Sequence, residues 1–137
     1  PNQVGGGKRP YHTIIPAFTT KNGAAHMSFG VMGGPMQPQG HLQVLSRVVA
    51  SGRDPQAALD APRWRVDGGL NVSLEPDTPP ATVTALQELG HDITVASHRD
   101  VSFGGGQAIL RMDHCWCGGS DGRRDGQVAG ATSPRVV

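Results

Sequence analysis

Glycine and proline divide this chain into short segments, and this feature limits the folds open to it more than any other. The 137 residues include 20 glycines and 11 prolines, well above the average usage of about 7% and about 5%. Turn-forming groups such as Asn22-Gly23, Gly33-Gly34-Pro35 and Pro79-Pro80 recur along the sequence. Because 36% of the residues are nevertheless hydrophobic, we interpret the chain as a folded domain with many turns.

Composition argues against several classes of protein. The 12 Lys and Arg residues nearly balance the 11 Asp and Glu residues, and both signs are scattered, unlike the basic stripe of a nucleic-acid-binding protein. No apolar run reaches the roughly 18 residues that a membrane span needs. We therefore predict neither nucleic acid nor a membrane as a partner. The residues leave the compartment open, and we favour the cytoplasm over the periplasm or secretion.

The first third of the chain predicts a β-hairpin and then a helix. Residues 11–18 are rich in β-branched and aromatic side chains, Asn22-Gly23 is a strong hairpin turn, and residues 25–31 form the return strand. His12 and Thr13 fall in the first strand, so only one of them is expected to face a given site. Apolar residues at spacings of three and four predict an amphipathic helix over 39–51.

The remainder predicts two further helices among short strands. Asp54-Pro55 begins a short helix that stops at Pro62, and Pro79-Pro80 begins another that Gly90 ends. Strands are expected at 63–66, 70–74, 91–95, 105–112 and 115–117, followed by a loop and frayed tail over 118–137. This order predicts an α+β fold with a largely antiparallel sheet, whose unpaired edges suggest a missing partner segment.

Two groups of residues are candidates for chemistry. Gly33-Gly34 lies between a strand and a helix, where backbone N–H groups form either an oxyanion hole or an ordinary tight turn. His12 and Thr13 either contact a polar substrate or form an ordinary strand pair. Spacing alone favours the tight turn in the first case and the ordinary strand pair in the second.

Other polar clusters are poor matches to known sites. His114, Cys115 and Cys117 lack the ligand spacing of a zinc site, and no second cysteine pair exists. Asp121 and Asp125 lack the closing Glu of a calcium loop, so they belong to a turn-rich surface segment or to a loop held by Asp–Arg pairs. We expect no metal and no cofactor.

Several segments taken together resemble the gamma-glutamyltransferase family of N-terminal-nucleophile hydrolases. In the family's order along the chain, they are Gly7-Lys8-Arg9-Pro10, Thr13 to Pro16, Phe29 to Gly34, Leu42 to Leu45, Asp54 to Arg63, Leu89-Gly90-His91, Gly106 to Ile109, Gly118 to Asp121 and Arg123 to Gly126. Each is a weak signal, but the set is specific and covers nearly the whole chain.

The resemblance implies a four-layer αββα sandwich, of which residues 1–137 would form the C-terminal part of the small subunit. Family members are made as one precursor that cuts itself, so that the small subunit begins with a threonine that is both nucleophile and, through its amine, base. The resemblance implies that the segment carrying this nucleophilic threonine lies outside residues 1–137. The partners implied are therefore the rest of the precursor, namely the large subunit and the N-terminal part of the small subunit, and a small-molecule substrate.

The resemblance also assigns roles to the candidate residues. In the family the diglycine, here Gly33 and Gly34, stabilises the oxyanion, and a serine pair binds the substrate's α-carboxylate at the positions of His12 and Thr13. The segments 10–16 and 32–41 look more like the branch that includes oxamate amidohydrolase. The implied activity is amide cleavage, through an acyl-enzyme, of a small carboxylate-bearing substrate such as a gamma-glutamyl compound or an oxamate-like amide. The alternative is a non-catalytic binding or structural fragment.

Overall fold

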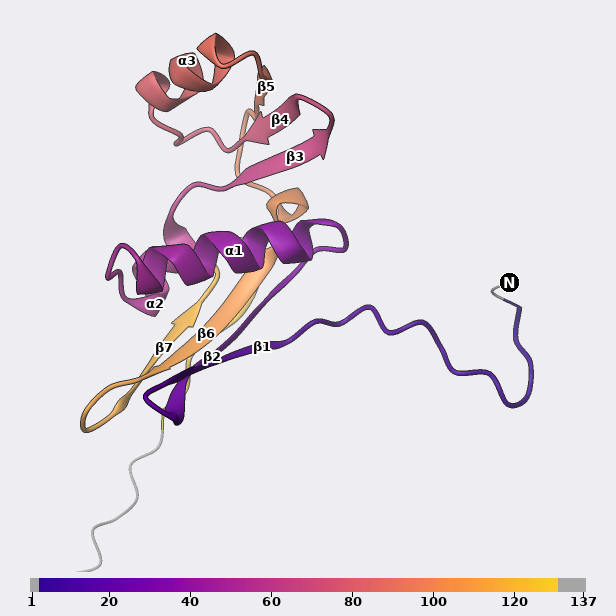
Figure 1. Cartoon of the computed structure of the whole chain (residues 1–137), viewed down its shortest axis with the longest axis vertical. Helices are drawn as coiled ribbons and strands as arrows, with labels where there is room; N and C mark the ends of the chain where they lie inside the picture. The colour runs from indigo at the N-terminus through magenta and orange to yellow at the C-terminus, as the bar shows by residue number, and fades with distance from the viewer. Residues whose placement is uncertain (1–2, 131–137) are drawn as a thin grey trace, which may run out of the picture.

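The computed structural model describes residues 3–130 and contains two β-sheets (Figure 1). The larger sheet is antiparallel, with strand order β1-β2-β6-β7. Its strands are β1 (Ala17–Lys21), β2 (Ala24–Met32), β6 (Gly105–Arg111) and β7 (Trp116–Ser120). Among the described residues, β1 and β7 are the edges of this sheet.

Two helices, α1 (Met36–Val49) and α2 (Pro55–Asp60), cover one face of the larger sheet (Figure 1). The core between them consists of buried apolar side chains from β2, β6 and both helices: Met27, Phe29, Val31, Val44, Val48, Ala58, Leu59 and Ala108. Helix α1 approaches β2 closely at Gly40, where an added Cβ would lie 2.5 Å from Cγ1 of Val31. A side chain at position 40 would therefore push α1 off the sheet.

The smaller sheet has the order β3-β4-β5 and lies with α3 at one end of the molecule (Figure 1). Its elements are β3 (Trp64–Gly68), β4 (Asn71–Leu74), α3 (Pro80–Glu88) and β5 (Asp92–Val95), and a 3₁₀ turn, η1 (Val101–Phe103), leads back to β6. Strands β4 and β5 are parallel, because the intervening α3 returns the chain to the same end of the sheet.

Local turn and capping signals are confirmed, whereas several element boundaries differ from the prediction. Asn22 and Gly23 adopt positive φ between β1 and β2, and the Asp54 side chain accepts a hydrogen bond of 2.9 Å from the Ala57 N–H at the start of α2. The predicted strand at 11–18 begins only at Ala17, and α1 begins at Met36 rather than at residue 39. Residues 118–120, expected in a loop, belong to β7; residues 131–137 of the predicted tail lie outside the described residues.

A buried ionic cluster joins the two sheets. Arg63 precedes β3, Glu75 follows β4, and Asp121 and Arg123 follow β7. The guanidinium of Arg63 donates to Asp121 at 2.5 Å, and Arg123 pairs with both Asp121, at 3.0 Å, and Glu75. The four side chains are at most 2% exposed. Since unpaired buried charges are costly, the cluster fixes how the sheets meet.

Backbone groups also bond to this cluster. Arg63 donates to the Phe103 carbonyl at 3.0 Å, and Asp121 accepts from the Gly106 N–H at 2.8 Å. Glu75 accepts from the backbone N–H of Arg63 at 2.7 Å. The loop after β7 is therefore held by Asp–Arg pairs, as one of the two predicted alternatives has it, but Asp121 is buried and not on the surface.

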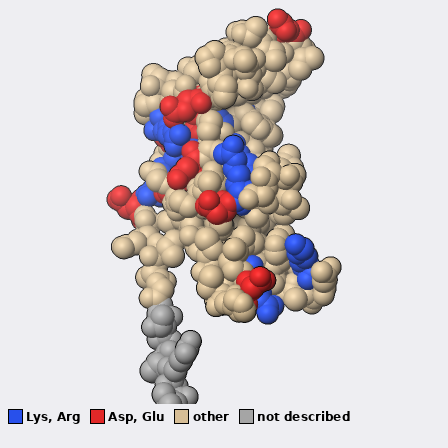
Figure 2. Space-filling model, turned by 90° about the vertical axis from the view of Figure 1, so that its left-hand side faces the viewer, with Lys and Arg blue, Asp and Glu red and all other residues tan. Residues whose placement is uncertain are grey.

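The face of the larger sheet opposite the helices exposes apolar side chains, among them Phe18, Ile109 and Trp116. Charged side chains are distributed differently: Figure 2 shows basic and acidic groups interleaved on one side of the molecule, without a broad area of one sign. No helix in residues 3–130 combines the length and apolarity that crossing a bilayer requires.

Removing Asp121 should destabilise the protein far more than removing an exposed partner. We expect Asp121→Ala to lower the free energy of unfolding by about 3–5 kcal/mol, because Arg63 is left buried without its main counter-charge. The control is Asp77→Ala, which breaks an exposed pair with Arg99 and should cost less than about 1 kcal/mol. Urea unfolding followed by tryptophan fluorescence measures both, and equal effects would contradict the role given to the cluster.

The same carboxylate makes stability depend on pH. Burial alone would raise the pKa of Asp121, but the charge of Arg63, the N–H groups of Arg123 and Gly106, and the charge of Arg123 outweigh it and lower the pKa. A lowered native pKa stabilises the fold above the ordinary value of about 3.9 and this stabilisation is lost as the pH falls through the native value. Between pH 5 and pH 2, the urea midpoint of the wild type should thus fall more steeply than that of Asp121→Asn. Parallel curves would contradict this.

Candidate functional site

Gly33 and Gly34 form a turn between β2 and α1 that leaves their amides free. Their φ angles are 138° and 59°, which residues with a Cβ rarely adopt. Their carbonyls accept the first helical hydrogen bonds, from Met36 at 3.1 Å and from Gln37 at 3.0 Å. Within residues 3–130, neither glycine N–H donates to another backbone or side-chain group. The turn and oxyanion-hole interpretations are therefore compatible, because both glycines are exposed and their N–H groups have no acceptor among the described residues.

The loop before β6 packs against this turn. A Cβ on Gly33 would lie 3.1 Å from the Cα of Gly104 and 3.1 Å from the Cβ of Met36. Gly104 itself adopts φ 81° and has room for no side chain, because a Cβ there would lie 2.6 Å from the Met32 carbonyl oxygen. This contact was not predicted, since nothing local in the glycine run at 104–106 indicates which turn it supports.

His12 and Thr13 lie in the extended segment before β1, and both line the cavity that Gly34 also lines. The cavity has a volume of about 390 Å³, and its other lining residues are Tyr11, Ile15, Pro35 and Gln37. Both His12 and Thr13 are exposed. The expectation that only one of the two faces a given site is wrong, because the alternation of a strand begins only at Ala17.

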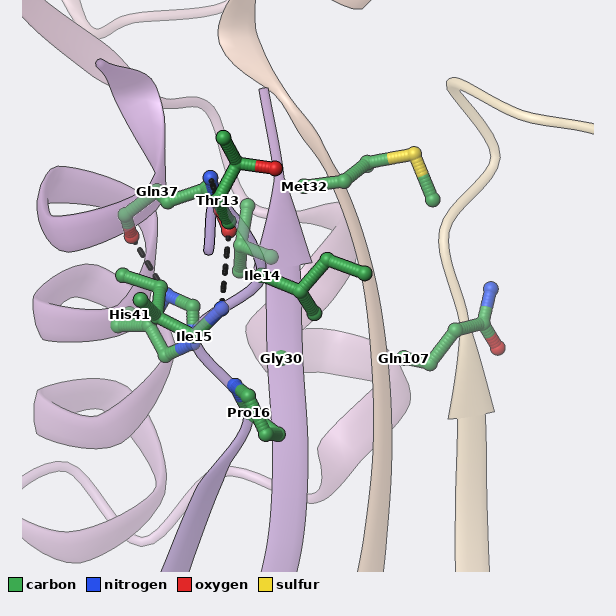
Figure 3. Close-up of a pocket in the computed structure, with 11 residues that line it drawn as sticks. Thr13, Ile14, Ile15, Pro16, Gly30, Met32, Gln37, His41 and Gln107 are labelled. Atoms are coloured by element: carbon green, nitrogen blue, oxygen red, sulfur yellow. Dashed lines mark hydrogen bonds between the residues drawn. The ribbon is translucent and has the colours of Figure 1, made fainter. Parts of the chain in front are cut away.

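Gln37 on α1 holds this extended segment in place (Figure 3). Its side-chain amide donates to the Thr13 carbonyl at 2.7 Å and accepts from the Ile15 N–H at 3.4 Å. The ring of His41, one turn further along α1, donates through Nδ1 to the Gln37 carbonyl at 2.5 Å, because a carbonyl oxygen can only accept. The sequence did not single out Gln37, which lies within the segment 32–41 that carries part of the resemblance but precedes the helix predicted over 39–51.

A second cavity, of about 460 Å³, adjoins the first along the wall formed by Thr13, Ile15 and Gln37. Gly30 and His41 are among its other lining residues. The Nε2 atom of His41 is buried there without a hydrogen-bond partner among the described residues. The Phe29 ring packs against His41 with centroids 5.4 Å apart. The site thus consists of a polar part at the diglycine and a largely apolar part beside it.

Residues 3–130 contain no group of three or more His, Cys, Asp or Glu side chains arranged to hold a metal ion. Cys115 is exposed and Cys117 half-buried, and both are free thiols. Asp121 is instead engaged with arginines.

Comparison with known proteins gives a consistent result. Residues 1–131 match the family model described as gamma-glutamyltranspeptidase. The oxamate amidohydrolase proenzyme of Klebsiella pneumoniae is 33% identical over 130 residues, and the glutathione hydrolase-like YwrD proenzyme of Bacillus subtilis is 34% identical over 131 residues. Each alignment covers 90% of this chain and 25% of the relative. The chain therefore spans about a quarter of the length of these curated relatives.

Solved structures share the fold as well. A cephalosporin acylase from Bacillus halodurans superimposes with a TM-score of 0.85 at 47% identity, over 97% of this chain and 25% of that one. The predicted fold class is confirmed: the chain has an α+β structure that forms part of the αββα sandwich of N-terminal-nucleophile hydrolases. The described residues supply one sheet layer and the helix layer on it.

Proposed function

Because this chain belongs to the gamma-glutamyltranspeptidase family, we propose that it is part of an amide-cleaving N-terminal-nucleophile enzyme. The nucleophilic threonine would come from another segment of the same precursor. The observation that carries the proposal is the single cavity lined by Gly34, His12 and Thr13, beside two glycine N–H groups without internal acceptors in the described part of the chain. Such a cavity offers donors for two negative charges, a carboxylate and an oxyanion.

The residues of this chain have distinct roles in the proposed reaction. The threonine hydroxyl attacks the amide carbonyl, its proton passes to the free α-amine, and the C–O bond forms as the carbonyl oxygen becomes an oxyanion. The N–H groups of Gly33 and Gly34 donate to that oxyanion. Collapse of the tetrahedral intermediate breaks the C–N bond, the amine leaves with a proton, and water or another amine then resolves the acyl-enzyme.

The substrate class follows from the second part of the site. Thr13 offers a hydroxyl and His12 a ring N–H to the carboxylate of a small substrate, where the family has two serines. This departure fits an oxamate-like amide as well as a gamma-glutamyl compound such as glutathione. The names of the relatives, an oxamate amidohydrolase and a glutathione hydrolase-like protein, support the same two classes.

The proposal is tested by assaying the intact protein, that is, the whole precursor after self-cleavage, with oxamate and with gamma-glutamyl-p-nitroanilide. We expect hydrolysis of at least one of them by the intact protein, and none by a purified chain of these 137 residues, because the proposed nucleophile belongs to another segment. Ammonia release and p-nitroaniline absorbance measure the two reactions. Inactivity of the intact protein towards both would favour the non-catalytic alternative, and turnover by the short chain would overturn the assignment of the nucleophile.

Substitution of Gly34 tests the oxyanion role. In the intact enzyme, Gly34→Ala should lower kcat by about a hundredfold, because a residue with a Cβ is strained at φ 59° and relaxation turns the amide away from the oxyanion. Position 34 has no atom within 4 Å of an added Cβ, whereas position 33 does, so Gly34 gives the cleaner test.

Gly69 supplies the matched control. It has φ 56°, no atom within 4 Å of an added Cβ, and a position in the β3–β4 turn far along the chain from the site. Gly69→Ala should carry the same backbone strain and leave kcat within about twofold. Equal losses of kcat in the two variants would mean that Gly33 and Gly34 form only a structural turn.

A further inference from the structure

Three glutamines on helix α1 make hydrogen bonds to extended segments that a neighbouring strand would otherwise make. Each of them bonds both a backbone N–H and a backbone carbonyl of an extended segment, as a strand in a ladder would. The bonded groups are Thr13 and Ile15 for Gln37, Val66 for Gln39, and Trp64 for Gln43. Gln39 and Gln43 bond β3, whereas Gln37 bonds the extended segment that contains Thr13.

Gln37 is needed at this point because the ladder of β1 has ended. Strand β1 pairs with β2 only from Ala17, opposite Phe29, and Pro16 has no N–H with which to continue the ladder. The hydrogen bonds that fasten residues 13–15 to the rest of the described structure are those of Gln37, at 2.7 Å to the Thr13 carbonyl and 3.4 Å from the Ile15 N–H.

Gln37 also contacts the diglycine. Its backbone N–H donates to the Gly34 carbonyl at 3.0 Å, while its side chain bonds the Thr13 carbonyl. One residue thus joins the two halves of the site. Its own carbonyl is fixed by His41 Nδ1 at 2.5 Å, and the His41 ring is packed against Phe29 in the core. The separation between Gly34 and Thr13 is therefore set by a side chain anchored on a rigid helix.

We propose that Gln37 is a positioning residue that fixes the spacing between the oxyanion donors and the carboxylate-binding Thr13, and so determines which carboxylate-to-amide distance the enzyme accepts. This inference rests on the proposed function of the site. In oxamate the carboxylate carbon is bonded directly to the amide carbonyl carbon, whereas three carbons separate the two in a gamma-glutamyl amide. A rigid spacing favours one of these substrates, because both groups of the substrate must be held at once.

The test compares selectivity in the intact enzyme, as the ratio of kcat/KM for oxamate to kcat/KM for gamma-glutamyl-p-nitroanilide. This ratio does not depend on the fraction of folded enzyme, so a merely structural loss leaves it unchanged. We expect Gln37→Ala to move the ratio by about tenfold or more towards unity, the size of effect of one lost hydrogen bond to a positioned group. Gln37→Glu retains the volume and the acceptor for Ile15 but cannot donate to Thr13, and should have a similar effect.

Gln39 provides the matched control on the same helix. Its amide makes the same two kinds of hydrogen bond, at 2.7 Å from the Val66 N–H and 3.3 Å to the Val66 carbonyl, but holds β3. Gln39→Ala should leave the ratio within about twofold. A double variant adds a second readout: if Gln37 acts through Thr13, then Gln37→Ala introduced into Thr13→Val should change the ratio no further.

The outcomes separate the inference from the function it rests on. An inactive wild type would overturn the proposed function and the inference with it. An active wild type whose ratio is unchanged in both Gln37 variants, or changes equally in Gln39→Ala, would overturn the positioning role alone. Should Gln37→Ala fail to fold, the same ratio measured in the isosteric Gln37→Glu decides between these outcomes.

Discussion

The buried ionic cluster is the interaction on which the rest of the structure depends, including the diglycine. Arg63 donates to the Phe103 carbonyl, and Asp121 accepts from the Gly106 N–H, so the cluster holds the chain on both sides of Gly104. Gly104 in turn packs against Gly33. Charges buried this deeply have few alternative arrangements that keep every partner. The position of the proposed oxyanion donors is therefore set by an ion pair between segments far apart in the sequence, and not by the turn alone.

Local chemistry made part of this fold predictable. The β1–β2 hairpin, the Asp54 cap and the β3–β4 hairpin each depend on a few adjacent residues whose backbone preferences agree. Apart from the pair between Asp121 and Arg123, the cluster depends on hydrogen bonds between residues 12 to 58 positions apart. No local pattern distinguishes a buried arginine from an exposed one. The residues of GGSDGRRDG therefore have the composition of a polar loop, although Asp121 is buried.

In the candidate site, too, local features were predictable and long-range contacts were not. Gly33 and Gly34 could be singled out from their place between strand and helix, and family resemblance supplied a role for them. The conformation of His12 and Thr13 was not predictable from composition, because β-branched neighbours favour a strand while Pro16 lacks the N–H that a ladder needs. What replaces the ladder is the side chain of Gln37, 22 and 24 residues further along the chain. A contact of that kind has no signature in a single sequence.

The open setting of the site bears on how the proposed reaction would work. Gly34, His12 and Thr13 are all exposed in the described structure, yet hydrogen bonds to an oxyanion stabilise it most when water is excluded. The sheet face opposite the helices exposes Phe18, Ile109 and Trp116, and an αββα sandwich requires a second sheet on that face. If the rest of a precursor supplies that sheet, its packing buries these side chains and brings a nucleophile to the edge of a preformed anion site. The diglycine, Thr13 and Gln37 would then be organised before the covering layer arrives, because their hydrogen bonds and packing lie within this chain.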